Sequence, residues 1–199
     1  MATVNLHPSS TVSNQWAVTG ELDGTPHLIH EVLSDTDDNT RIFTADQNRT
    51  TIVQLDDYGE GGTISSIRHY IRGFKHNTRS GDVEVQVIID DSSGTTLYSE
   101  NHQLLFNGYN PQDFNGTART TSDGSSAWTD GDLDGLILNI NTSPEDPDGV
   151  SKATVVKAYI EVTFTAASGY GNDVMGVASA NIATVNGIAT ANISEVIGV

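Results

Sequence analysis

A regular alternation of side chains in residues 153–165, ATVVKAYIEVTFT, limits the folds open to this chain more than any other feature. Successive side chains of a strand point to opposite faces, so this alternation predicts one long strand with a buried face. The face expected to be buried carries Val156, Ala158, Ile160, Val162 and Phe164, and the other carries Val155, Lys157, Tyr159, Glu161 and Thr163. A second strand of this kind is predicted in GDVEVQVII, residues 81–89, where Val83, Val85, Val87 and Ile89 alternate with other residues.

Shorter segments of strand-like composition occur along most of the chain. They are residues 2–6, 28–32, 41–44, 51–55, 64–74, 96–99, 102–106 and 136–141. Clusters rich in Gly, Pro, Asn and Asp separate them, as expected of turns. Only WTDGDLDGL, residues 128–136, predicts a short helical turn, with Thr129 or Asp130 as its N-cap. Short strands divided by turns predict an all-β fold, an antiparallel, jelly-roll-like β-sandwich.

The character of the sequence changes after Phe164. We expect a β-sandwich domain over residues 1–165, a linker over residues 166–173 and a C-terminal tail over residues 174–199. The tail is an eleven-residue repeat, in which 177–187 align with 188–198. A glycine in each unit and many β-branched residues disfavour a long helix. We therefore expect a short repeat outside the sandwich, with a turn at Asn186 and Gly187.

The tail is nearly uncharged, whereas the rest of the chain is strongly acidic. Residues 176–199 carry one charged side chain, Glu195, against a net charge of −17 for the whole chain. Six apolar side chains recur along the tail: Ile182, Val185, Ile188, Ile193, Val196 and Ile197. Each would gain roughly 1.5–3 kcal/mol on full burial, against its own sandwich or against another subunit. The linker and the separate repeat favour another subunit, so we expect the tail to be the assembly interface of a homo-oligomer, with a trimer favoured.

The charge balance restricts the partners of the chain. With 26 acidic residues against 9 Lys and Arg, it lacks the cationic surface that nucleic acids and anionic membranes require, so we expect neither partner. No apolar run reaches the roughly 20 residues that span a bilayer. The absence of cysteine excludes zinc sites built on thiolates. The first residues, MATVNLHPSS, have neither the basic start nor the apolar stretch of a secretory signal.

Four segments, which follow an early Trp16, together resemble a known family. They are LIHEVLSDTDDNTRIF (28–43), GGTISSIRHYIRGF (61–74), AWTDGDLDGL (127–136) and VVKAYIEVTF (155–164). Residues 2–165 resemble a jelly-roll-like β-sandwich module of tailed bacteriophage virion proteins. The ANI-x-x-VNG repeat of the tail is similar to terminal segments of marine phage structural proteins. The resemblance implies a place in the virion after assembly in the host cytoplasm, a surface or adhesion role, and no catalytic residues.

The acidic segment SDTDDNT, residues 34–40, is the strongest candidate for a metal site. Asp35, Asp37, Asp38 and Asn39 offer the hard oxygen ligands that calcium prefers. The segment lacks the glycine and the distal glutamate of an EF-hand loop. Two interpretations stay open: a structural calcium site, or a solvated acidic turn whose side chains bond local backbone amides. We expect no other cofactor.

Patterns typical of enzymes are weak in this sequence. His27, His30 and Glu31 form H-x-x-H-E, whereas a zinc-protease helix needs HExxH with both histidines on one face. In the strand expected here, His27 and His30 would point to opposite faces. There is no G-x-S-x-G motif and no cysteine nucleophile. We therefore expect a protein that is not an enzyme.

A cluster of basic and aromatic residues in the predicted strand 64–74 is a candidate partner-binding stripe. On a strand, Arg68, Tyr70, Arg72 and Phe74 share one face. They could hold an acidic neighbouring subunit or an acidic sugar, or they could pair with the chain's own acidic strands, for example with Glu84 across a hairpin. Trp16 and Trp128 could stack on sugars, although a buried position is commoner for Trp in a sandwich.

These observations favour a non-enzymatic phage virion structural protein. The first prediction is a head decoration or cement protein that binds the capsid surface, with the major capsid protein or other virion subunits as partners. The alternative is a carbohydrate-binding or adhesion module of a tail fibre, or the subunit of an extracellular filament. Copy number per particle separates a cement protein, present in hundreds of copies, from a fibre module.

Overall fold

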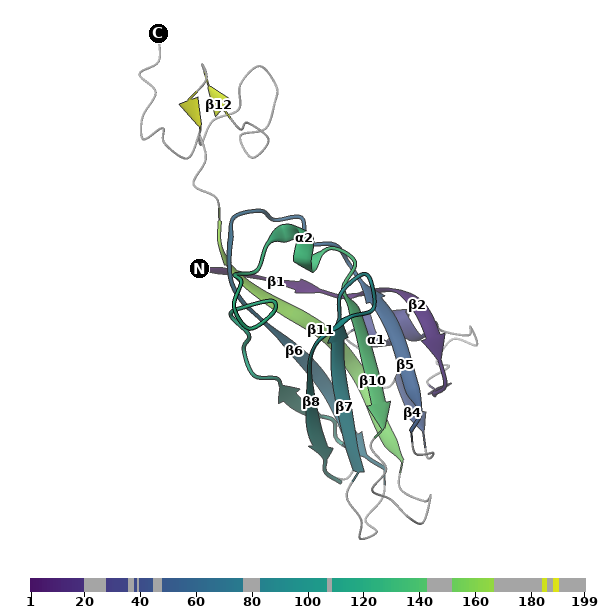
Figure 1. Cartoon of the computed structure of the whole chain (residues 1–199). Helices are drawn as coiled ribbons and strands as arrows, with labels where there is room; N and C mark the ends of the chain where they lie inside the picture. Colours follow the sequence, from purple (N-terminus) through teal and green to yellow (C-terminus); the bar gives the residue numbers. More distant parts are fainter. Residues whose placement is uncertain are drawn as a thin grey trace.

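Two antiparallel sheets packed face to face form the body of the molecule (Figure 1), which confirms the predicted all-β sandwich. The computed structural model describes residues 1–19, 28–35, 38, 40–44, 48–76, 83–106, 109–142, 152–166, 184–185 and 188–189. Among these residues, no helix has the length and apolar character needed to cross a membrane.

One sheet has six strands and contains the longest strands of the chain. These are β1 (Ala2–Leu6), β3 (Ala17–Thr19), β4 (Arg41–Thr44), β6 (Thr63–Lys75), β9 (Gln112–Asn115) and β11 (Ala153–Thr165). Their order is β3-β4-β11-β6-β9, and β1 also pairs with β11. The central pair, β6 and β11, runs from Ala153 opposite Lys75 to Thr165 opposite Thr63.

The second sheet has five strands in the order β2-β5-β10-β7-β8. They are β2 (Pro8–Asn14), β5 (Thr50–Leu55), β7 (Val83–Asp90), β8 (Thr96–Leu104) and β10 (Ile137–Thr142). A separate two-stranded ladder pairs β12 (Thr184–Val185) with β13 (Ile188–Ala189). This ladder brackets Asn186 and Gly187, where the sequence predicts a turn.

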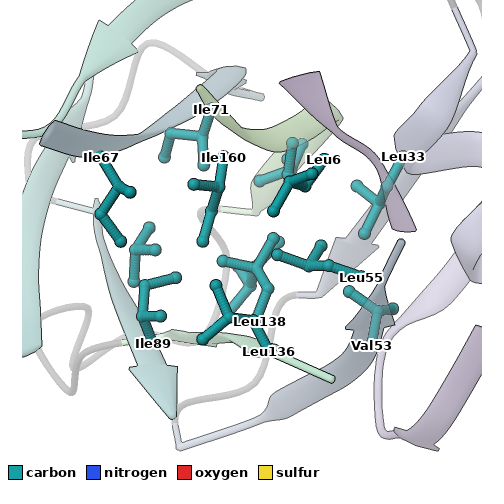
Figure 2. Close-up of a cluster of buried hydrophobic side chains, with 14 of the residues drawn as sticks. Leu6, Leu33, Val53, Leu55, Ile67, Ile71, Ile89, Leu136, Leu138 and Ile160 are labelled. Atoms are coloured by element: carbon teal, nitrogen blue, oxygen red, sulfur yellow. The ribbon is translucent and has the colours of Figure 1, made fainter. Parts of the chain in front are cut away.

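The core lies between the two sheets. Figure 2 shows Ile67, Ile71 and Ile160 of the six-stranded sheet pointing toward the same interior as Leu55 and Leu138 of the five-stranded sheet. All five are at most 1% exposed. The full burial of each such side chain stabilises the fold by roughly 1.5–3 kcal/mol, so the alternating strands account for most of the driving force.

A β-bulge in β11 changes the face on which its first residues lie. The register with β6 shifts between Val155 and Lys157, so Val156 is an extra residue. Val155 and Ala158 belong to the core, whereas Val156 is buried outside it, so the predicted core position of Val156 is wrong. An extra residue reverses the alternation on one side of a bulge. On β6, Gly73 lies opposite Val155. A Cβ added at position 73 would stand 2.5 Å from the Thr154 carbonyl oxygen.

The strand predicted over residues 28–32 is wrong, because helix α1 (Ile29–Ser34) occupies this position. Ile29, Val32 and Leu33 are buried, and their i, i+3, i+4 spacing is that of a helix face. The Glu31 carboxylate accepts a hydrogen bond from the Leu28 backbone N–H at 2.9 Å, which caps the first turn. The helix packs against β2 of one sheet and against β4 and β11 of the other, and so closes one side of the sandwich.

Other differences concern short or polar strands. The predicted strands 96–99 and 102–106 are one strand, β8, and the sequence pattern missed β2, β3 and β9. β2 is polar and lies at a sheet edge, where burial imposes little alternation. The helical turn predicted in 128–136 is confirmed as α2 (Asp130–Leu133). The Asp132 carboxylate accepts hydrogen bonds from the Thr129 backbone N–H and hydroxyl at 2.8 and 2.7 Å.

The buried side chains of the described residues run from Leu6 to Phe164, which leads to a prediction about the tail. Deletion of residues 174–199 should leave a cooperative thermal transition, with the melting temperature within about 2 °C of the full chain, because no described core contact is removed. Calorimetry of the truncated and full chains checks this. Loss of the transition would show that the tail belongs to the core.

Candidate binding face

The outer face of the six-stranded sheet carries the charged and aromatic residues of β6. Arg68, Tyr70 and Arg72 point outward, whereas the alternate residues Ile67, His69 and Ile71 are fully buried. Phe74 lies on the same outer side but is also fully buried. Its ring is stacked with His76, with 6.3 Å between centroids, and meets the ring of Tyr109 edge-on at 6.2 Å. The exposed part of the predicted stripe is therefore Arg68, Tyr70 and Arg72.

Two tyrosines from neighbouring strands form the centre of this face. Strand pairing places Tyr159 of β11 opposite Tyr70 of β6. Their rings stack with 4.5 Å between centroids and 22° between planes, and we name this pair the tyrosine platform. The ring of His7 lies 5.4 Å from that of Tyr159 on the platform's border. Both tyrosines are half-buried, so the rings make one aromatic surface that is partly open to solvent.

Arg72 and two carboxylates fix one border of the tyrosine platform. The Arg72 guanidinium donates to both oxygens of Asp38, at 2.8 and 2.7 Å, and to Asp113 at 2.6 Å. The Tyr70 hydroxyl donates to the same Asp113 oxygen. A guanidinium held by two carboxylates has few accessible orientations. The platform's polar border is thus set before any ligand arrives.

These contacts also set the ionisation of the border. Burial, reinforced by the hydrogen bond to Asp113, raises the pKa of Tyr70. Burial pushes the pKa of Asp113 upward, but the bonds from Tyr70 and Arg72 outweigh it and leave that pKa lowered. The bond from Arg72 lowers the pKa of Asp38. At neutral pH the tyrosine is therefore protonated and both carboxylates are ionised.

Arg68 and Glu161 form the opposite border. The Arg68 guanidinium donates to the Glu161 carboxylate at 2.7 and 2.6 Å, and the Arg68 side chain is 44% exposed. An exposed pair of this kind contributes at most about 1 kcal/mol, so its main effect is on side-chain position. The suggested pairing with Glu84 is wrong, because Glu84 lies on β7 of the other sheet, where Asn101 donates to it at 3.4 Å.

The predicted calcium ligands are only partly described. Asp35 accepts a hydrogen bond from the Thr40 hydroxyl at 2.5 Å, and Asp38 is bonded by Arg72 on both oxygens. Asp37 and Asn39 lie outside the described residues. Within the described part of the chain, no three His, Asp or Glu residues are grouped so as to hold a metal ion. The calcium site stays a prediction.

An acidic cleft of about 490 Å³ lies between the β7–β8 turn, residues 122–127 and α2. Asp91, Asp123, Asp132 and Asp134 line it. Three of these carboxylates already accept hydrogen bonds within their own turns, for example Asp123 from the backbone N–H groups of Ser125 and Ser126. These three acids therefore serve local turn structure.

The remaining candidates fall into two groups. Ile182, Ile193, Val196 and Ile197 lie outside the described residues, and the structure gives only the backbone pairing of Val185 with Ile188. The assembly role of the tail stays a prediction. Trp16 and Trp128 are buried, and their indole N–H groups donate to the carbonyl oxygens of Arg49 and Arg119, each at 2.9 Å. Neither indole is placed to stack on a ligand.

Sequence reasoning missed two members of the binding face. Tyr159 was placed on the outer side of its strand by period-two alternation, but nothing in the sequence showed that Tyr70 would be its cross-strand neighbour. Asp113 lies on β9, opposite Arg72, in a segment whose Gly, Asn and Pro residues indicate a turn. No local signal could have identified it.

Comparison with known proteins gives only a loose likeness. No protein-family model matches the chain, and no curated protein matches it. Among solved structures, it is similar to a glycoside hydrolase family 43 arabinoxylan arabinofuranohydrolase from Bacillus subtilis, which was solved with cellotetraose. The sequence identity is 9% and the TM-score is 0.43, and the match covers 82% of this chain and 27% of that one. The CBM22-1 xylan-binding domain of Xyn10C from Paenibacillus barcinonensis gives 9% identity, a TM-score of 0.39, and coverage of 82% and 87%. The ligands in these names belong to those proteins.

Proposed function

We propose that this chain is a non-catalytic module that binds carbohydrate on the outer face of its six-stranded sheet. The observation that carries the proposal is the tyrosine platform, two stacked rings from different strands with polar borders fixed on both sides. Sugars present apolar C–H surface together with hydroxyl groups. Aromatic surface next to a few oriented polar groups is the usual way to bind such a molecule.

The borders of the platform suit hydroxyl ligands. The side-chain oxygens of Asp38, Asp113 and Glu161 keep acceptor positions beyond those that the arginines use. Arg68 and Arg72 supply further N–H donors in fixed directions. Charges that are already paired cost less to bring into contact with a ligand than isolated charges would. A neutral polyol can therefore bond to this border without leaving a charge uncompensated.

The same groups favour binding over catalysis. A general acid must be protonated at working pH, and a general base must be free to take a proton. The pKa of Asp113 and that of Asp38 are lowered, so neither carboxyl is a proton donor near neutrality. The pKa of Tyr70 is raised, so its hydroxyl is not a base. These shifts support a role in holding a ligand.

The proposal predicts that removal of one ring weakens binding of soluble oligosaccharides by about tenfold, which corresponds to about 1.4 kcal/mol. The variant is Tyr159→Ala, measured by titration calorimetry after a panel of neutral and acidic oligosaccharides has selected a ligand. Tyr159→Phe is the matched control, because it keeps the ring, and its affinity should stay within about twofold. Absence of binding across the panel, or equal affinity of the alanine variant, would refute the proposal.

The predicted capsid decoration remains a separate proposal. It rests on the tail and on the resemblance to virion modules, and it predicts a place in the virion, a trimer and a capsid partner. An adhesion module of a tail fibre, the alternative from the sequence, accords with a carbohydrate-binding face. Mass spectrometry of purified particles, with copy number per particle, tests both locations.

A further inference from the structure

A second concave site lies on the outer face of the six-stranded sheet, beyond the tyrosine platform. It is a pocket of about 200 Å³ between β4, the end of β6 and the start of β11. Its lining is Arg41, Phe43, His76, Lys152 and Thr154, and we name it the basic pocket. Three of these five side chains are basic, although the chain as a whole has a net charge of −17.

Strand pairing builds the floor of the basic pocket. Thr154 of β11 lies between Phe43 of β4 and Phe74 of β6 in one cross-strand row. The Lys152 ammonium stands 4.9 Å from the centroid of the Phe43 ring, and the Arg41 guanidinium stands 5.9 Å from that of Phe74. Each cation thus lies over an aromatic ring, and no described carboxylate pairs with it.

Within the described part of the chain, the cations of the basic pocket are not paired with carboxylates as the other arginines of this face are. Arg68 and Arg72 are paired with carboxylates, whereas Arg41 and Lys152 have no ion pair with any residue that the structure describes. Burial, followed by the nearby charges of Lys152 and Arg41, lowers the pKa of His76. The ring of Tyr109 also packs against His76, with 5.0 Å between centroids. Among the residues that the structure describes, positive charge therefore collects at this pocket without a carboxylate paired to it.

The Thr154 side chain provides an independent sign of a missing ligand. Thr154 is fully buried, and its hydroxyl oxygen has no hydrogen-bond partner within the described structure. Buried hydroxyls are nearly always bonded, because loss of water without a replacement is unfavourable. Thr154 is one of the residues that line the pocket, together with the three basic side chains, so its unpartnered hydroxyl lies beside the place where an acceptor would be held.

We propose that the basic pocket binds an oxyanion, such as a carboxylate, a sulfate or a phosphate. Arg41 and Lys152 supply charge and N–H donors, and Thr154 supplies a hydroxyl donor at the floor. The volume suits one anionic group with its immediate substituents, since each water in the liquid occupies about 30 Å³. An oxyanion in this position would pair with cations that have no carboxylate partner among the described residues, and it would accept a hydrogen bond from the Thr154 hydroxyl.

The position of the basic pocket also indicates which class of carbohydrate the tyrosine platform binds. This extension rests on the proposed function. Tyr70 of the platform and Phe74, the cross-strand neighbour of the pocket residue Thr154, are four residues apart on β6, which corresponds to about 13 Å. A short oligosaccharide that lies along the strand would reach both. The ligand of the whole face is therefore an acidic glycan whose carboxylate enters the basic pocket.

The first experiment tests the pocket with small anions. Isotope-labelled full-length protein is titrated with sulfate, phosphate and galacturonate at constant ionic strength, against chloride. We expect saturable shifts of the Phe43 and Thr154 amide signals and a rise in the pKa of His76, because a bound anion stabilises its protonated form. Absence of saturable shifts with all three anions would overturn the proposal.

Variants separate the pocket from general charge effects. Arg41→Gln should weaken anion binding by about tenfold, whereas Arg49→Gln, the same change at an exposed arginine just before β5, should have less than a twofold effect. Thr154→Val should also weaken binding while leaving the melting temperature unchanged or higher, because it removes an unpartnered buried hydroxyl. Equal affinities of the Arg41 and Arg49 variants would refute the site.

Oligogalacturonide and its methyl ester distinguish the sources of the oxyanion. Tighter binding of the acidic oligomer than of galacturonate, weakened by both Arg41→Gln and Tyr159→Ala, supports the acidic-glycan extension. If the acidic oligomer binds no more tightly than galacturonate, and Tyr159→Ala does not change its affinity, the extension is overturned and the pocket is a site for small anions. Binding of the uncharged ester, lost in Tyr159→Ala, supports the tyrosine platform independently of the pocket.

Discussion

Replacement of Gly116 by alanine is expected to destabilise the fold by about 3 kcal/mol, because its Cβ has no room. The added carbon would lie 2.2 Å from Cε1 and 2.4 Å from Nδ1 of His69. The His69 ring is fully buried, its Nε2 is 2.6 Å from Nε2 of His102, and it stacks on Tyr98 with 5.9 Å between centroids. The ring therefore cannot turn aside without the loss of both contacts.

Denaturant unfolding followed by fluorescence measures this effect, and two comparisons make it specific. Gly59→Ala is the matched control, since nothing lies within 4 Å of a Cβ there and its effect should be below about 0.5 kcal/mol. Gly116→Ala in a His69→Ala background should cost far less than in the natural chain, because the clashing ring is gone. Equal costs in both backgrounds would show that the ring is not the cause.

The sequence was a sufficient guide wherever burial imposed a long regular pattern. β7, and β11 from Lys157 onward, follow the alternation that predicted them, since a strand with one buried face has only one register that hides its apolar set. The bulge at Val156 was not predicted, because the two valines before Lys157 are compatible with either face of the strand. Helix α1 was not predicted, because over so few residues IHEV is compatible with both a strand and a helix. The contacts of this segment with both sheets decide for the helix.

The binding face was less predictable for a physical reason. Its contacts join residues that are distant in the chain, such as Arg72 with Asp113 and with Asp38. The basic pocket brings Arg41, His76 and Lys152 together in the same way. Strand order decides these neighbours, and strand order depends on the packing of the whole sandwich. The local sequence pattern predicts that Arg68, Tyr70 and Arg72 share one face, but it does not predict which residues pair with them.

The buried pair His69 and His102 is expected to make stability depend on pH in mildly acidic solution. Their Nε2 atoms are 2.6 Å apart, so one neutral ring donates its N–H to the lone pair of the other, and two charged rings could not share this contact. Burial, followed by the neighbouring His102, lowers the pKa of His69 from 6.5 to about 4. Burial also lowers the pKa of His102.

The direction of the change in stability with pH depends on whether the folded or the unfolded chain binds protons first as the pH falls. Above about pH 6.5 both histidines are neutral in the folded and unfolded chains, and the stabilisation is fully present. As the pH falls below 6.5, the unfolded chain binds protons that the folded chain excludes, so the free energy of unfolding decreases until about pH 4, where His69 protonates in the fold. A shift from 6.5 to about 4 corresponds to about 3 kcal/mol lost over this window.

Denaturant unfolding at a series of pH values from 7 down to about 4.5 checks this, with the double variant His69→Leu/His102→Leu as reference. Other groups titrate in the same range, including His7 and His76, whose pKa values are also lowered, and the many carboxylates near its acidic end. The variant keeps all of them, so the difference between the two curves isolates the pair. We expect the natural chain to lose about 2–3 kcal/mol more than the variant between pH 7 and 4.5. Parallel curves, or a His69 signal that titrates near 6.5 in nuclear magnetic resonance, would show that the buried pair accepts protons freely and would remove this source of acid sensitivity.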